Sequence, residues 1–173
     1  MRIAVSGAHR TGKTTLVEAL SDLLPSYEVV DEPYHQLVEE GHEFAEMPSL
    51  EDFELQLRRS IDCLGEGGDQ LFDRCPADLL AYLVTHEDAD AFDLDAWLPR
   101  ARAAMQRLDL VVFVPIEHPD RVVVPAAERA LRHRVDEALR EGLVDDRWDL
   151  GVVVLEVEGS TAERARQVLA RLR

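Results

Sequence analysis

The sequence predicts a three-layer α/β domain, in which a parallel β-sheet lies between two layers of helices. Five short apolar runs alternate along the chain with segments whose apolar residues recur at helical spacing. A glycine-rich loop separates the first apolar run from the helix after it, and acidic residues end the second and third runs. Because strands joined through helices run parallel, their carboxyl ends meet at one edge of the sheet, where ligands bind in such folds.

The expected strands are short, and the fourth is apolar throughout, as in a strand that is buried on both faces. The strands are expected at residues 1–6, 27–30, 70–72, 109–115 and 151–157. The expected helices repeat apolar residues every three to four positions. They span residues 14–24, 34–41, 50–64, 77–85, 96–108, 126–143 and 161–172. A loop is expected at residues 42–48 and an acidic connector at residues 87–95.

Several helix boundaries have recognisable chemistry. A serine three residues before an acidic residue is typical of a capping box, and this pattern begins at both Ser49 and Ser160. Pro33 comes directly after the second strand and prevents it from continuing, since proline cannot donate to a sheet. Residues 65–68 read G-E-G-G and are expected to end the helix that Ser49 opens.

Residues 7–15 read G-A-H-R-T-G-K-T-T and fit the pattern G-x-x-x-x-G-K-[ST]. In this pattern, the glycines let successive backbone N–H groups converge on a phosphate, and the dipole of the following helix adds to the attraction. Lys13 would attract the β- and γ-phosphates, and the Thr14 hydroxyl would bind Mg²⁺. The expected nucleotide-binding residues are Gly7, Ala8, His9, Arg10, Thr11, Gly12, Lys13, Thr14 and Thr15.

Lys13 is the only lysine among 19 basic residues, all the others being arginine. An ammonium on a flexible stem acts as a compact point charge, a task that the planar guanidinium performs differently. This contrast supports a catalytic role for Lys13.

Length and composition limit the function classes. With 173 residues, the chain is expected to form one domain, residues 1–173. The net charge of −16 argues against a nucleic-acid partner. No apolar run is long enough to span a bilayer and no secretory segment is evident, so we expect a cytoplasmic protein without a membrane partner. The histidines and cysteines lack zinc-ligand spacing, and a homodimer is one of the assembly states left open.

Acidic residues follow two expected strands at the edge where the loop lies. Glu32 could orient or deprotonate a substrate hydroxyl, and Asp73 could hold a metal ion. Arg74 could bind an anionic or polar substrate group. Each could instead be a helix cap or a surface charge. In another assignment, Asp31 is the metal ligand, Glu32 activates water, and Asp73 is secondary.

Arginines are frequent in residues 117–142, which we expect to form a lid. Phosphoryl transfer builds up negative charge, which arginines on a mobile flap can neutralise. Arg129 and Arg132 are spaced to share a helix face and are the expected catalytic arginines. In the alternative, this face is solvated and pairs with neighbouring acids. The other arginines of the segment are Arg121, Arg134 and Arg140.

Aromatic and polar residues after the second and third strands are candidates for substrate binding. A nucleoside-like ring could stack on aromatic side chains, with a side-chain amide reading its edge. The expected substrate residues are Glu32, Tyr34, His35, Gln56 and Arg74. Phe53 and Tyr82 are more consistent with the core.

Together these residues resemble small P-loop kinases, in particular nicotinamide-riboside-kinase-like bacterial ATPases and deoxyribonucleoside kinases. The resemblance is carried by the loop 7–15, the Glu32-Pro33 pair, residues 53–56 and the run from Asp73 to Tyr82. It implies a P-loop NTPase fold with a five-stranded parallel sheet of order 2-3-1-4-5, an ATP-Mg²⁺ site and a lid. In the deoxyribonucleoside kinases, the residues matching Glu32, Asp73 and Gln56 are the base, the acid beside the metal and the glutamine that contacts the nucleobase. A tryptophan after Glu-Pro and a tight R-x-x-R-G-R cluster, common in that family, are absent here.

The expected activity is ATP-dependent phosphoryl transfer to a hydroxyl of a small metabolite that is nucleoside- or nucleotide-like, with ATP and Mg²⁺ as cofactors. The alternative is a stand-alone ATPase, or a nucleotide-gated regulatory module, without a small-molecule acceptor. Transfer of labelled phosphate to an acceptor would distinguish the two.

Overall fold

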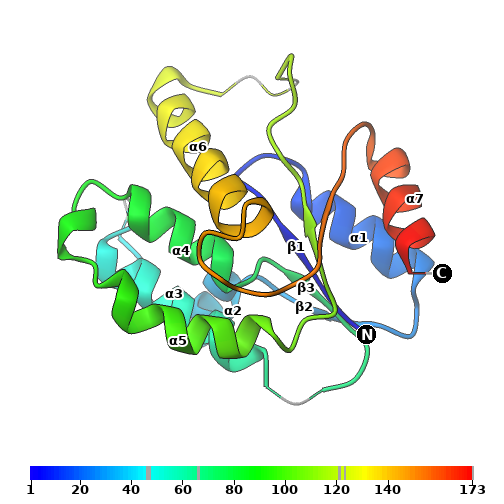
Figure 1. Ribbon diagram of the computed structural model, residues 1–173, viewed down its shortest axis with the longest axis horizontal. Coiled ribbons are helices and arrows are strands. Elements are labelled where there is room, and N and C mark those ends of the chain that lie inside the picture. Colours follow the sequence, from blue (N-terminus) through cyan, green and yellow to red (C-terminus); the bar gives the residue numbers. More distant parts are fainter. Residues whose placement is uncertain (46–47, 66, 121, 123, 173) are drawn as a thin grey trace.

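The computed structural model describes residues 1–45, 48–65, 67–120, 122 and 124–172. It contains a five-stranded sheet in the order β2-β3-β1-β4-β5, with every neighbouring pair parallel (Figure 1). This order confirms the predicted fold class. The strands are β1 (Arg2–Ser6), β2 (Glu28–Val30), β3 (Gln70–Asp73), β4 (Leu110–Phe113) and β5 (Val154–Glu156).

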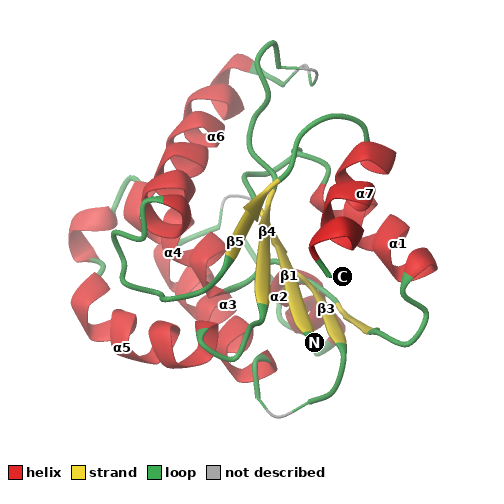
Figure 2. Cartoon of the chain, turned by 45° about the vertical axis from the view of Figure 1, so that its right-hand side comes forward, coloured by secondary structure: helices red, strands yellow, loops and turns green. Residues whose placement is uncertain are grey.

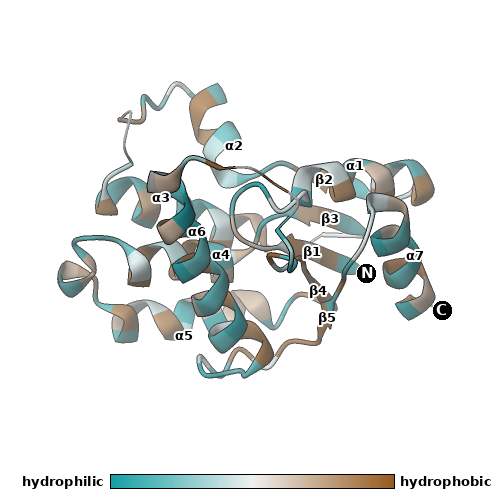
Figure 3. Ribbon diagram, turned by 90° about the horizontal axis from the view of Figure 1, so that it is seen from above, coloured by the Kyte–Doolittle hydropathy of each residue, from teal (hydrophilic) through white to brown (hydrophobic). Residues whose placement is uncertain are grey.

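Helices cover both faces of the sheet. They are α1 (Lys13–Leu23), α2 (Pro33–Glu39), α3 (Leu50–Cys63), α4 (Pro76–Thr85), α5 (Leu94–Met105), α6 (Ala126–Leu139) and α7 (Thr161–Arg171). Figure 2 shows α1 and α7 on one side of the sheet and α3, α4, α5 and α6 on the other. Seen from above, the ribbon of α6 is coloured mostly as hydrophilic residues (Figure 3).

Alternation along the strands separates the core into two clusters. Ile3 and Val5 of β1 pack with α1 and α7, whereas Ala4 between them packs with the helices of the opposite face. All three are fully buried. This is the two-residue period that a strand buried on both faces requires.

The strand register places the expected site residues together. Val5 of β1 is opposite Asp73 of β3 on one side and Val112 of β4 on the other. The chain therefore leaves β1 for the glycine-rich loop directly beside Asp73. The elements that follow β1, β2 and β3 begin at the same end of the sheet, as expected for parallel strands.

Capping chemistry forms where the sequence indicates it. The Ser49 Oγ accepts from the Asp52 N–H at 3.2 Å and opens α3, and the Ser160 Oγ accepts from the Glu163 N–H at 3.4 Å and opens α7. In each case the acidic side chain accepts the serine N–H in return. Both predicted capping boxes are confirmed.

Several expected boundaries are wrong, and the strand expected at residues 151–157 extends only over Val154–Glu156. The helix expected at 126–143 is α-helical only to Leu139 and then widens into a π-helical turn, η2 (Arg140–Val144), where the Trp148 ring packs against Gly142. The acidic connector 87–95 contains a short 3₁₀ turn, η1 (Ala89–Ala91), and α5 begins before the connector was expected to end. Within the described residues, none of the helices has the length and apolar character needed to cross a membrane.

Candidate functional site

The β1–α1 loop has a backbone that its glycines make possible. Gly12 lies in the left-handed region with φ +88° and caps α1, and Arg10 is left-handed as well at +59°. A Cβ on Gly7 would lie 2.4 Å from the Val114 carbonyl oxygen, so no other residue fits there without movement. Successive amides of such a loop at a helix N-terminus form an anion-binding hollow.

Lys13 lies inside this loop. Its side chain is buried, and its Nζ donates to the Ala8 carbonyl at 2.7 Å. Burial and the nearby Arg74 guanidinium lower the pKa of Lys13 to about 7. A triphosphate bound in the hollow would supply the negative charge that favours the ammonium form.

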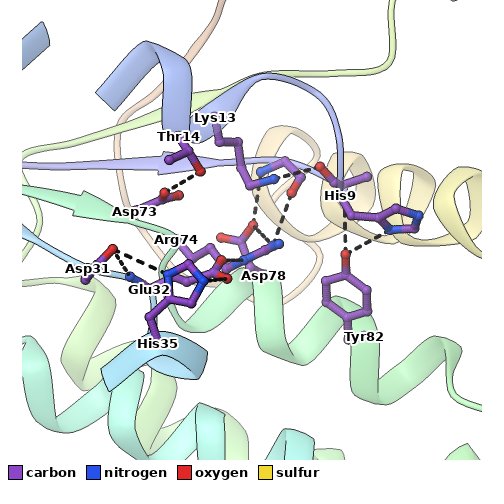
Figure 4. A network of polar contacts seen from close by, with 12 residues as sticks. His9, Lys13, Thr14, Asp31, Glu32, His35, Asp73, Arg74, Asp78 and Tyr82 are labelled. Carbon is purple, nitrogen blue, oxygen red and sulfur yellow. Dashed lines mark hydrogen bonds and ion pairs between the residues drawn. The ribbon is translucent and has the colours of Figure 1, made fainter. Parts of the chain in front are cut away.

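Thr14 and Asp73 provide the oxygen atoms expected for Mg²⁺. The Thr14 hydroxyl donates to Asp73 Oδ2 at 2.7 Å (Figure 4). Asp73 is only 4% exposed, and its Oδ1 makes no hydrogen bond within the described part of the chain. Burial raises the pKa of Asp73. A buried carboxylate oxygen without a partner is costly, and a bound cation would compensate it.

The residues therefore fit a magnesium ion that is held mainly by its nucleotide. Among the described residues there is no group of three or more His, Cys, Asp or Glu side chains arranged to hold a metal. Mg²⁺ commonly takes one or two protein oxygens and completes its shell with phosphate and water. Asp31 shares a cavity of about 300 Å³ with Thr14 and Asp73, so the alternative metal ligand also lies near this position.

Glu32 and Arg74 form an ion pair at the carboxyl ends of β2 and β3. The Arg74 Nε donates to Glu32 Oε2 at 2.6 Å. Burial favours the protonated form of Glu32, but the charge and hydrogen bond of Arg74 outweigh it and lower the pKa of Glu32. The Glu32 side chain is thus a carboxylate at neutral pH. Arg74 has φ +79°, an unusual value for a residue with a side chain, at the turn from β3 into α4.

Asp78 connects α4 to the loop between β1 and α1, which is the expected nucleotide-binding loop. Its side chain is fully buried, with Oδ1 accepting the Gly7 N–H at 3.0 Å and Oδ2 accepting the Cys75 N–H at 3.0 Å. Arg74 lies 3.5 Å from the same carboxylate. Sequence reasoning did not assign Asp78 a site role. The sequence indicates only its capping role, because an acid two residues after a proline at the start of a helix is typical of helix capping.

His9 is held by Tyr82 of α4. The Tyr82 Oη accepts the His9 backbone N–H at 3.2 Å and lies 3.1 Å from His9 Nδ1. Burial, and then the charges of Arg132 and Lys13, lower the pKa of His9 to about 4. His9 is therefore neutral at physiological pH, and Tyr82 can donate its hydroxyl proton to Nδ1.

Two adjoining cavities open at this end of the sheet. One, of about 290 Å³, is lined by the loop residues His9 to Thr15 except Thr11, together with Glu32 and Arg74. The other, of about 280 Å³, lies toward α3 and α4 and has aromatic walls. Its lining residues are His9, Glu32, Tyr34, Pro48, Phe53, Gln56, Arg74, Leu79, Tyr82 and Leu131. His9, Glu32 and Arg74 line both cavities.

The expected substrate residues are only partly brought together. Gln56 is buried and lines the aromatic cavity, and its amide donates to the Asp52 carbonyl at 3.3 Å. Phe53 and Tyr82, expected to be core residues, are stacked with ring centroids 5.2 Å apart and form a wall of that cavity. His35 is exposed, lies 3.8 Å from Glu32, and is not among the described residues that line either cavity.

The arginines of α6 differ in placement. Arg132 is buried and its Nε donates to the His9 carbonyl at 2.9 Å, whereas Arg129 is exposed and lies 3.5 Å from the Val124 carbonyl. Arg134 is exposed, Arg140 pairs with Glu156, and Arg121 lies outside the described residues. Helical spacing placed Arg129 and Arg132 near each other but could not show that one turns inward. The lid and its catalytic arginines stay predictions.

The sequence matches a family model described as AAA domain over residues 2–164. Among solved structures, deoxyadenosine kinase from M. mycoides aligns with 99% of each chain, at 14% identity and a TM-score of 0.66. Shikimate kinase from Aquifex aeolicus aligns over 99% of this chain and 96% of that one, at 18% identity and a TM-score of 0.59. The NadR protein aligns over 98% of this chain and 48% of that one, at 20% identity and a TM-score of 0.68. No curated protein matches the chain by sequence. At these identities, the structural likeness shows the fold.

Proposed function

Because the chain belongs to the AAA domain family and has the fold of P-loop kinases, we propose that it is an ATP-dependent kinase acting on a small metabolite. The acceptor group is a hydroxyl, and the acceptor is nucleoside- or nucleotide-like. The loop and the fold support nucleotide binding, and to this we add the transfer reaction and the class of acceptor.

The observation that carries the proposal is the shared border of the two cavities. One cavity is lined by the nucleotide-binding loop and the other by stacked aromatic rings. Only at His9, Glu32 and Arg74 does the described lining belong to both. A γ-phosphate held by the loop and a hydroxyl held in the aromatic cavity would meet at this border, which is the proximity that phosphoryl transfer requires.

The residues at the border suit an in-line transfer. The acceptor oxygen forms a bond to the γ-phosphorus, the bond from that phosphorus to the bridging oxygen breaks, and ADP leaves. The acceptor proton passes to the Glu32 carboxylate, which Arg74 keeps ionised and in place. Lys13 and Arg74 offset the negative charge that accumulates on the phosphate oxygens.

Mg²⁺ would be held by Thr14 and Asp73 and would neutralise charge on the β- and γ-phosphates. The protein would then contribute one oxygen atom from Thr14 and one from Asp73 to the metal ion. The carboxylate of Asp73 is fixed by the Thr14 hydroxyl, so both groups are set in position before the nucleotide arrives.

The aromatic cavity supports a ring-bearing acceptor. Stacked Phe53 and Tyr82 offer a flat apolar surface, and the Gln56 amide provides a donor and an acceptor for the edge of a ring. The names of two similar structures, deoxyadenosine kinase and thymidylate kinase from Candida albicans, include substrates of this type. Shikimate kinase has the same fold, so the acceptor needs a direct test.

A panel of nucleosides, nucleotides and other hydroxyl-bearing metabolites, incubated with ATP labelled on the γ-phosphate, tests the proposal. Label transferred to one acceptor class is the expected result. If only free phosphate is released, at a rate that no acceptor changes, the protein is instead an ATPase without a small-molecule acceptor.

The Glu32→Gln variant tests the assigned base. Loss of the proton acceptor should lower the transfer rate by about 10² to 10⁴, while ATP affinity changes by less than about twofold. Glu39→Gln, at an exposed position of α2, is the matched control and should behave as the unaltered protein. Full transfer activity in Glu32→Gln would show that another group accepts the proton.

A further inference from the structure

Two arginines from different helices donate to three consecutive carbonyls of the nucleotide-binding loop. Arg132 of α6 donates from Nε to the His9 carbonyl at 2.9 Å and from Nη2 to the Arg10 carbonyl at 3.4 Å. Arg164 of α7 donates from Nη1 to the Thr11 carbonyl at 2.7 Å. The two arginines lie far from the loop in sequence, and the exposed fraction of Arg132 is 1% and that of Arg164 is 9%. Such burial of arginine is rare unless the charge is paired.

Each of these arginines is paired with an acid from the segment between β4 and α6. Arg132 forms an ion pair with Asp120, and Arg164 Nη2 lies 2.8 Å from Glu117 Oε1. Glu117 also accepts the Gly159 N–H at 2.6 Å, which ties it to the start of α7. Because their charges are already paired, the two arginines are poorly suited to neutralising a transferred phosphate.

The direction of these bonds matters for the loop. A peptide group carries its N–H and C=O on opposite sides, so a carbonyl that is held on the outside of the loop directs amide groups toward the inside. The His9, Arg10 and Thr11 carbonyls are all held in this way. These are the variable positions of the motif, where the sequence itself imposes no glycine.

We propose that Arg132 and Arg164 are positioning residues that hold the nucleotide-binding loop in its anion-binding shape before the nucleotide binds. Because the loop is already ordered, nucleotide binding does not lose free energy in ordering it. This inference rests on the proposed function for the identity of the ligand, but the effect on the loop can be measured without an acceptor. It also gives Arg132 a role other than the catalytic one that its place on α6 predicts.

The planar guanidinium is needed for this role. Its donors point in fixed, separate directions, so one side chain can bridge a carbonyl and a carboxylate. Lysine at the same position would keep the charge but could not maintain both contacts in that geometry. Arg164→Lys is therefore expected to recover only part of what Arg164→Gln loses.

The test compares Arg132→Gln and Arg164→Gln with exposed arginines on the same helices, Arg134→Gln and Arg166→Gln. Affinities for Mg-ATP and for Mg-triphosphate without a nucleoside are measured by calorimetry, well below the melting temperature of each variant. Both dissociation constants should rise about tenfold, and by the same factor, in Arg132→Gln and Arg164→Gln, because preorganisation of the loop acts on the phosphates alone. The control variants should stay within about twofold of the unaltered protein.

A lower melting temperature with unchanged dissociation constants would mean that the arginines only stabilise the fold, and would overturn the proposal. If a glutamine variant does not fold, the corresponding lysine variant is compared with the unaltered protein by the same measurements. A rise in both constants again supports the proposal, and unchanged constants overturn it.

Hydrogen exchange in nucleotide-free protein separates this inference from the proposed function. The Gly7 and His9 amides are hydrogen-bonded to Asp78 and Tyr82, so their exchange reports on loop order. In Arg132→Gln, exchange over residues 7–9 should become about tenfold faster while α3 is unchanged. Unchanged exchange at residues 7–9 would overturn the inference even if the unaltered protein binds ATP. If the unaltered protein binds no nucleotide, only the proposed function fails.

Discussion

His9 is a loop residue that contacts both α4 and α6. Its carbonyl is held by α6, its N–H and ring contact Tyr82 of α4, and its ring lies at the border of the two cavities. The neutral imidazole offers one further donor at this border, on Nε2. A residue that the loop motif leaves free is thus part of both expected binding regions.

The pKa of His9 predicts a pH effect on stability. Because folding lowers this pKa from 6.5 to about 4, the unfolded chain takes up a proton that the folded protein refuses as the pH falls from about 6.5 toward 4. Stability is therefore lost in this window. The full shift would correspond to about 3 kcal/mol, and partial exposure to water reduces this to about 1 kcal/mol. The charged groups around the ring are Arg132, Lys13, Glu128 and Arg74.

Urea unfolding at pH 7 and at pH 4.5 measures this loss. In His9→Asn, the difference in free energy of unfolding between the two pH values should be about 1 kcal/mol smaller than in the unaltered protein. His133→Asn, at an exposed position of α6, should leave the difference unchanged. An equal difference in His9→Asn and the unaltered protein would show that His9 is not the group responsible.

At the residue scale, the sequence predicted the groups that belong to a local pattern. Lys13 and Thr14 follow from the loop motif, and Glu32, Asp73 and Arg74 follow from their places at strand ends. Asp78 and Arg164 could not be assigned in this way, because their roles depend on contacts with Gly7 and Thr11, 71 and 153 positions away. The side-chain chemistry was visible in the sequence, but the partner was not.

At the scale of elements, the first turn of α4 fixes the position of the nucleotide-binding loop. Asp78 lies in that turn and accepts hydrogen bonds from both the start of its own helix and the Gly7 amide. Asp78 also lies 3.5 Å from Arg74, which donates to Glu32. Helix capping and site assembly are therefore one set of contacts.

Asp78→Asn should lower the free energy of unfolding by about 2 to 4 kcal/mol, because an amide nitrogen replaces one acceptor and leaves a buried donor unpaired beside Arg74. Urea unfolding followed by circular dichroism measures the change. The control is Asp95→Asn, an exposed acid in the first turn of α5, expected to change stability by less than about 0.5 kcal/mol. Equal effects of the two substitutions would contradict the assigned role of Asp78.

Element types were predictable where local pattern decides them. Strand–helix alternation and the capping boxes at Ser49 and Ser160 needed only neighbouring residues. The π-helical turn Arg140–Val144 was not predicted, since it occurs where Gly142 meets the Trp148 ring, and helical periodicity carries no information about that contact. The same limit applies to Arg129 and Arg132, whose spacing does not reveal which one is buried.

At the scale of the molecule, charge is the dominant global property. The chain has a net charge of −16, so the folded state concentrates negative charge that the unfolded chain spreads out. Yet the site itself gathers cationic groups, with Arg10, Lys13 and Arg74 lining the cavity at the nucleotide-binding loop. Local cations at the strand ends thus counter the global field where an anionic ligand would bind.

This charge predicts that salt stabilises the protein. Raising NaCl from about 10 mM to about 150 mM shortens the screening length from roughly 30 Å to roughly 8 Å. The melting temperature should rise, because self-repulsion of the folded state is weakened. Choline chloride should produce the same rise and sucrose of equal osmolality a smaller one, whereas a fall in melting temperature with NaCl would contradict the prediction.

The whole fold was predictable because two independent signals agreed. Alternating elements indicated a parallel sheet, and the likeness to P-loop kinases supplied the strand order, β2-β3-β1-β4-β5, that the alternation alone leaves open. The two core clusters on opposite faces follow from the alternation of Ile3, Ala4 and Val5. The placement of α6 against the loop depends on packing across the whole molecule and could not be read from any segment.

The single lysine side chain of the protein is buried in the nucleotide-binding loop with a pKa of about 7. Acylating reagents attack uncharged amines, so near neutrality they have one side-chain target here, apart from the amino terminus. We expect the mass added at Lys13 to report on occupancy of the loop, because a bound triphosphate would cover the amine and favour its ammonium form. Chemistry that labels most proteins indiscriminately becomes a site-specific sensor in this one.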